Sequence, residues 1–123
     1  MTAISISKEI YNLHINDDIL KGLVADKIYP LIAEEETTFP FIIFKKNSIQ
    51  TEYTKDGRVF DEVNISITSI ATDYFTTVNI IERVREIFEN CRLFAMCRLS
   101  GVTEDYIDNA FIMEISFNIK IKQ

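Results

Sequence analysis

Residues 111–122 read FIMEISFNIKIK, and this stretch decides the fold. Every second side chain from Phe111 to Ile121 is apolar, whereas Glu114, Ser116 and Asn118 stand between them. Strict alternation of this kind predicts a β-strand with one face buried. Because a slip of one residue would turn all six apolar side chains outward, the register of this strand is strongly set.

Two longer stretches, 41–53 and 59–70, are expected to form a hairpin around Asp56-Gly57. The start of the first strand, Phe41-Ile42-Ile43-Phe44, is apolar on both faces, which requires burial on both sides. Helices could cover one side, whereas the other needs a second layer or another subunit. Both strands exceed the usual length of about 5–6 residues, so we expect the hairpin tip to project.

Shorter elements complete the predicted sheet. Pro30 cannot donate to a ladder, so residues 26–33 are interpreted as an edge strand or an extended segment. Residues 94–107 predict another strand with a bulge at Ser100-Gly101, and Asp108-Asn109 predicts the turn into the last strand. The acidic stretch Glu34–Glu36 is interpreted as a solvated turn, with a patch for a metal ion or a cationic partner as the alternative.

Helical periodicity appears in three places. Residues 4–14 predict a short helix, and Asn16-Asp17-Asp18 predicts the cap of a second helical turn. Thr72 or Asp73 caps a clear amphipathic helix over residues 74–89. The predicted fold class is therefore α+β: a two-layer domain with a mainly antiparallel sheet of four to five strands. The helix at about 73–90 and the short N-terminal helix pack on one face, and residues 1–123 form a single domain.

Composition excludes several classes of protein. The chain has 123 residues, and 19 acidic residues against 13 basic ones give a net charge of −6. Such a balance argues against a dedicated nucleic-acid binder, which needs a basic surface. The sequence offers neither a membrane-spanning run nor a signal peptide, so we expect a cytosolic protein with reduced Cys91 and Cys97.

The inventory of reactive residues predicts no enzyme. His14, the single histidine, is interpreted as a surface or helix-terminal residue. No phosphate-binding glycine loop or nucleophile motif occurs, and adjacent carboxylates such as Asp61 and Glu62 point apart on a strand. We therefore expect no catalytic residue, no cofactor and no metal site. The unusual feature is surplus apolar and β-prone surface, which usually marks partner contacts. The candidate subunit-interface residues are Ile42, Phe44, Ile49, Tyr53 and Arg58.

The order of elements resembles that of the tail-completion (tail-terminator) proteins of long-tailed bacteriophages and prophages. The resemblance lies in Lys27-Ile28-Tyr29-Pro30, Phe39–Phe44, the hairpin into Val63–Ile67, the helix 73–89 with Val84-Arg85, and the final alternating strand. It covers nearly the whole chain but includes no catalytic motif.

This resemblance implies a structural protein of the phage tail. Such proteins form a ring, commonly a hexamer, that caps the tail tube and presents a surface to the head connector. The implied partners are further copies of the chain, the tube protein and the connector protein, with DNA passing through unbound and no membrane involved. The implied location is the bacterial cytoplasm during assembly and then the virion tail. The alternative is a small ferredoxin-like ligand-binding or regulatory module, which needs a pocket with converging polar groups.

Overall fold

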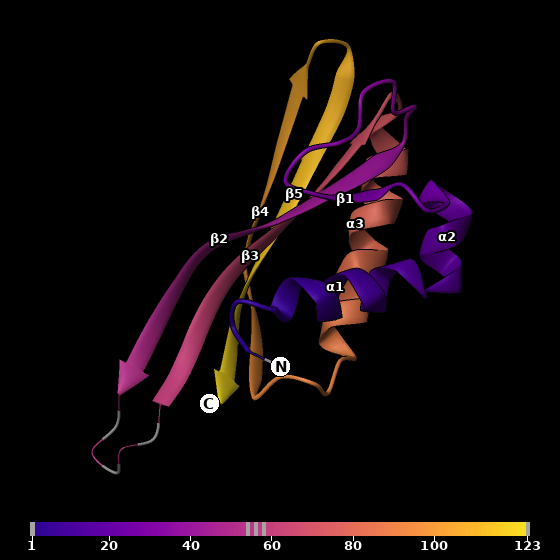
Figure 1. Cartoon of the computed structure of the whole chain (residues 1–123). Coiled ribbons are helices and arrows are strands. Elements are labelled where there is room, and N and C mark those ends of the chain that lie inside the picture. The colour runs from indigo at the N-terminus through magenta and orange to yellow at the C-terminus, as the bar shows by residue number, and fades with distance from the viewer. Residues whose placement is uncertain (1, 54, 56, 58, 123) are drawn as a thin grey trace.

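A single five-stranded sheet with helices on one face forms the body of the protein (Figure 1). The computed structural model describes residues 2–53, 55, 57 and 59–122. In chain order the elements are α1 (Ile6–Ile15), α2 (Asp18–Val24), β1 (Ile28–Pro30), β2 (Phe41–Tyr53), β3 (Val59–Ala71), α3 (Tyr74–Glu89), β4 (Met96–Ile107) and β5 (Ala110–Lys122). The α+β prediction is confirmed.

The strands lie in the order β1-β2-β3-β5-β4. β1 runs parallel to β2, and every other neighbouring pair is antiparallel, so the sheet is mainly antiparallel as predicted. The short, proline-ended β1 lies at one edge, where a missing backbone donor is tolerated. The element order differs from the β-α-β-β-α-β order of ferredoxin-like proteins, so that part of the alternative prediction was wrong.

Local sequence signals explain where the elements begin and turn. Asp17 and Asp73 cap α2 and α3, each accepting a hydrogen bond from a backbone N–H three residues later, at 2.9 and 3.0 Å. Asp108 and Asn109 adopt φ angles of 51° and 63°, which a two-residue hairpin turn requires. The register between β4 and β5 shifts between Leu99 and Gly101, which confirms the predicted bulge.

One apolar core lies between the sheet and the helices. The alternating residues of β5 from Met113 to Ile121 are all buried on the side of the helices. Phe117 lies at the centre, where its ring centroid is 4.3 Å from that of Phe88 in α3. Across the sheet, Phe117 is the register partner of Ile65, which is also buried. We call this side the helix face and the other side the open face.

Two of the predicted interface residues belong to this core. Ile42 and Phe44 are 1% and 5% exposed and lie within the core cluster on the helix face. These two candidate subunit-interface residues therefore pack within the core of one chain. The two-sided pattern arises because Phe41, on the open face, packs against the rings of Phe39 and Tyr29 at 5.6 and 6.5 Å. The segment before β2 thus supplies part of the cover for which the sequence left a second layer or another subunit as alternatives.

The single histidine is helix-terminal, which was one of the two predicted placements, and it is buried. His14 lies in the last turn of α1, as expected, but it is buried rather than on the surface. Its ring centroid lies 5.1 Å from that of Phe88. The side chain fills a gap between α1 and α3 because an imidazole ring presents flat apolar faces as well as its two nitrogens.

Candidate interaction surfaces

The described titratable side chains include one buried histidine, His14. Among the described residues no group of three or more His, Cys, Asp or Glu side chains could hold a metal ion. The Nδ1 atom of His14 lies 2.7 Å from the carbonyl oxygen of Ile10, so the ring carries its proton there. Burial lowers the pKa of His14 to about 4. The ring is therefore neutral at physiological pH and enclosed by core side chains.

The described residues at the end of the β2–β3 hairpin form a first candidate surface, which we call the arm (residues 49–53, 55, 57, 59 and 60). In Figure 1 the ends of β2 and β3 extend away from the helices. Alternation places Ile49 and Tyr53 on the helix face of the sheet, but they are 40% and 80% exposed because they lie beyond the helices. An aromatic side chain this exposed at a protruding tip is a typical anchor for a protein–protein contact.

The open face is a second candidate surface. At one end it carries Phe41, Ile70 and Ile112, which are neighbours across three adjacent strands. In the middle it is polar: Asn64 donates to Asn118 across the β3–β5 pair with a nitrogen–oxygen distance of 2.7 Å. An antiparallel sheet can expose one face to water in this way, and the polar middle fits a solvated or wet surface.

A groove between α1 and β1 is a third candidate surface, and we call it the α1–β1 groove. Its volume is about 770 Å³, within the roughly 300–1,000 Å³ typical of pockets that hold a ligand. Its apolar lining includes Tyr11, Ile28, Tyr29 and Phe44. Its charged lining consists of Lys8, Asp26 and Glu34. The aromatic floor and acidic rim suit an occupant that is partly apolar and carries positive charge.

The five predicted interface residues do not form one cluster. Ile42 and Phe44 lie at the start of β2, whereas Ile49 and Tyr53 lie towards its far end. Phe44, although nearly buried, contributes to the floor of the α1–β1 groove. Arg58 lies outside the described residues. The structure therefore separates the set into a core residue, a groove residue and two arm residues.

The groove itself was missed by sequence reasoning. Tyr11 was assigned only to a short helix, and Glu34 was assigned to a solvated turn. They meet because the parallel pairing of β1 with β2 brings the segment after β1 back towards α1, and no local pattern reveals a parallel pairing. The alternative interpretation of Glu34, a patch for a cationic partner, was the one available signal.

The described helices offer no membrane-crossing segment, since none is both long and apolar enough. No protein-family model matches the sequence, and no curated protein is significantly similar to it. The fold, by contrast, is shared with a chain in the solved structure of the virion of a native gene transfer agent particle. The two chains superpose with a TM-score of 0.80 at 10% sequence identity, over 93% of this chain and 92% of the other. The protein therefore has the fold of a chain from a gene transfer agent virion along almost its whole length.

Proposed function

We propose that this protein is a structural part of a phage or phage-like particle, in which it caps the tail tube. Residues 1–123 act as one domain, and copies of it form a ring that offers the joining surface between tail and head. The observation that carries the proposal is the fold shared with a gene transfer agent virion chain over nearly the full length of both chains. The particular position, at the head-proximal end of the tail, rests on the order of elements in the sequence.

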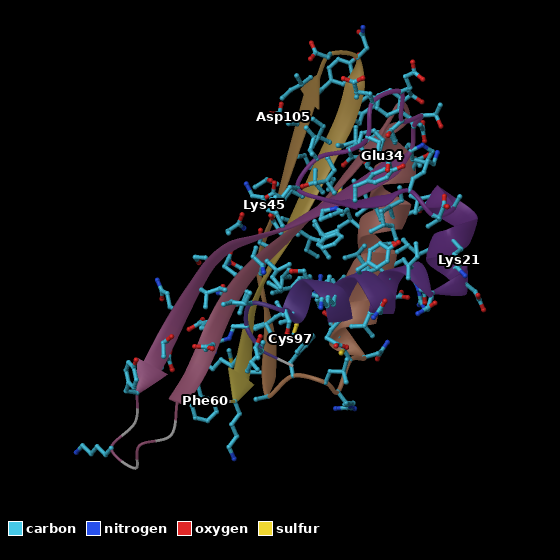
Figure 2. The ribbon with its side chains drawn as sticks, in the orientation of Figure 1. Lys21, Glu34, Lys45, Phe60, Cys97 and Asp105 are labelled. Atoms are coloured by element: carbon cyan, nitrogen blue, oxygen red, sulfur yellow. The ribbon has the colours of Figure 1, made fainter. Side chains whose placement is uncertain are left out.

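A ring needs two different surfaces on each subunit, because one copy must contact the next head to tail. The arm and the α1–β1 groove are two such surfaces, and they lie on different parts of the fold. Figure 2 shows Phe60, on the arm, and Glu34, at the groove, towards opposite ends of the molecule. This separation supports a head-to-tail arrangement. A contact between identical patches would instead give a twofold dimer, to which no third copy could be added through the same patch.

The charge of the protein agrees with a conduit for DNA. Each copy carries a net charge of −6, so every copy added to the ring makes its electrostatic potential more negative. A negative lumen repels phosphates, so DNA passes without binding. We expect no sequence-specific contact between the protein and the bases, and no ionic contact between the protein and the phosphates.

A ligand-binding or regulatory module is the second candidate function, and the α1–β1 groove is the observation that favours it. A small molecule with an apolar body and a positive group would fit the lining described above. A screen of such compounds by thermal shift, with Phe44→Ala as the variant that alters the groove floor, tests this candidate. A saturable rise in the melting temperature that Phe44→Ala abolishes would support the module.

The proposed capping role is tested with purified tube protein that polymerises in solution. Adding the protein during polymerisation should shorten the tubes and leave a density at one end in negative-stain images. An equal amount of heat-denatured protein serves as the control. Tubes of unchanged length with bare ends at a large molar excess of the protein would contradict the proposal.

A further inference from the structure

The arm carries an exposed aromatic ring and an exposed lysine, and the lining of the α1–β1 groove includes aromatic and acidic side chains. We infer that the arm of one copy inserts into the α1–β1 groove of the next copy, with Tyr53 against the aromatic floor and Lys55 against the acidic rim. This inference rests on the proposed ring and names the contact that forms it.

The arm supplies the side chains that insert. Tyr53 is 80% exposed at the end of β2, and Lys55 is also exposed. Glu52, their neighbour, is already paired with Lys120, with a nitrogen–oxygen distance of 3.2 Å. That pairing offsets the charge of Glu52. Residues 53–58 carry Lys55 and Arg58 against the one carboxylate of Asp56, so this part of the sequence has a net positive charge. Tyrosine loses few rotatable bonds on docking, which favours it as an anchor.

The α1–β1 groove is the surface that receives the arm. Tyr11 lies at one wall of the groove, and its ring centroid is 6.3 Å from that of Phe44 on the floor. Asp26 and Glu34 stand at the rim, and no described residue forms an ion pair with either of them. Lys8 is the opposing charge in the lining, so the groove keeps an excess of negative charge. An aromatic ring flanked by a lysine fits this lining.

The occupant of the groove is a second copy of the chain, because the arm of one chain cannot reach its own groove. Phe44 lines the groove, and Tyr53 lies nine residues further along the same strand. At a rise of about 3.3 Å per residue, the two are about 30 Å apart, so a chain cannot place its arm in its own groove. A neighbouring copy faces no such limit. Repeating the contact joins copies head to tail, which closes into a ring where the rotation permits.

The test uses the full chain and two single variants, each damaged on one surface only. Tyr53→Ser removes the anchor and leaves the groove intact, whereas Glu34→Lys reverses a rim charge and leaves the arm intact. Phe75→Ser and Glu35→Lys are the matched controls, because both positions are exposed and lie outside the two surfaces. Circular dichroism and melting temperature confirm that every variant is folded.

Sedimentation velocity over a range of concentrations is the first measurement. Tyr53→Ser and Glu34→Lys should each weaken self-association at least tenfold, and the two controls should leave it unchanged. A mixture of the Tyr53→Ser and Glu34→Lys proteins retains one good arm and one good groove, so it should form one-to-one dimers and no larger ring. Variants that assemble like the wild type would overturn the inference while leaving the capping role standing.

A charge exchange isolates the predicted pairing of Lys55 with the rim. Lys55→Glu and Glu34→Lys should each weaken association, whereas the double variant should recover most of the wild-type affinity. A double variant weaker than either single variant would contradict the pairing.

Amide chemical shifts cover the case of weak association. Labelled Tyr53→Ser protein, titrated with unlabelled Glu34→Lys protein to roughly 1 mM, should show shifts at Tyr11, Ile28 and Tyr29, since a complex of millimolar affinity is detectable there. No shift at those amides would overturn the inference. Loss of tube capping in Tyr53→Ser with self-association unchanged would also overturn it, and would direct the arm to the tube protein instead.

Discussion

Arg83 of α3 donates two hydrogen bonds to the carboxylate of Asp17, the residue that caps α2. The Nε–Oδ2 distance is 2.9 Å and the Nη2–Oδ1 distance is 2.6 Å. The same carboxylate accepts the backbone N–H of Leu20 at 2.9 Å. One side chain therefore begins a short helix and fastens it to the long one, which stabilises α2 although Gly22 weakens its interior.

Removing this carboxylate should detach α2. Asp17→Ala should lower the free energy of unfolding by about 1 kcal/mol through the lost cap alone, and further through the lost pairing with Arg83. Asp17→Asn keeps an acceptor for the cap and should fall between wild type and Asp17→Ala. Urea unfolding at pH 7 measures all three. Equal stability of Asp17→Ala and wild type would show that the pairing contributes nothing.

The pairing with Arg83 lowers the pKa of Asp17 below its ordinary value. The stabilisation is therefore present above the ordinary carboxylate pKa and is lost as the pH falls through the lowered one. In Arg83→Leu this loss should begin at a higher pH than in wild type, and a nuclear magnetic resonance titration of the Asp17 carboxyl carbon follows it. An unchanged titration midpoint in Arg83→Leu would contradict the assignment.

Acid should also act through His14, in a different pH window. Burial lowers the pKa of His14 from 6.5 to about 4, so the unfolded chain binds a proton more readily than the folded one between these values. Stability should fall as the pH drops from 6.5 to 4, by about 3 kcal/mol at 1.36 kcal/mol per pKa unit. His14→Leu removes the titrating group and should lose this slope. A parallel pH dependence in both proteins would contradict the role of His14.

Cys97 should react slowly with alkylating reagents in the folded protein. Burial raises the pKa of Cys97 to about 12, so at pH 8 its thiolate is roughly a thousandfold scarcer than that of an unperturbed cysteine. Alkylation by iodoacetamide should therefore be slow at Cys97 in the folded protein and fast in urea. The Cys91→Ser variant isolates Cys97 for this measurement. Fast labelling of Cys97 without denaturant would show that β4 opens readily.

The contact between Phe88 and Phe117 should be the most sensitive point of the core. Phe117→Ala should cost about 3–5 kcal/mol, whereas Phe117→Leu should cost much less because it leaves a smaller cavity. Phe75→Ala, at an exposed position on the same helix as Phe88, is the control and should change stability by no more than about 0.5 kcal/mol. Equal losses at Phe117 and Phe75 would place the core elsewhere.

Local patterns were enough to predict most of the fold. The alternation of residues 111–121 set the register of β5, and Asp73 marked the start of α3. The bulge before Gly101 and the turn at Asp108-Asn109 follow from conformational preferences of single residues, which need no knowledge of the rest of the chain.

Features that depend on distant segments could not be predicted. The burial of Ile42 and Phe44 depends on the helices that cover β2, and the cover of Phe41 depends on Phe39 and Tyr29 folding back beside it. His14 is buried because α1 crosses α3, which no periodicity within α1 reveals. The α1–β1 groove arises from three separate segments. The sequence therefore predicted the strands, whereas the α1–β1 groove could be recognised only in the structure.

Cryo-electron microscopy of the particles made by the phage or prophage that encodes this chain would locate the fold in the assembled particle. We expect a ring of copies with this fold at the head-proximal end of the tail tube, with each arm in contact with the neighbouring copy. Particles that lack the protein should have bare tube ends and no attached heads. A map that places the fold elsewhere in the particle, or particles that join heads to tails normally without the protein, would contradict the account.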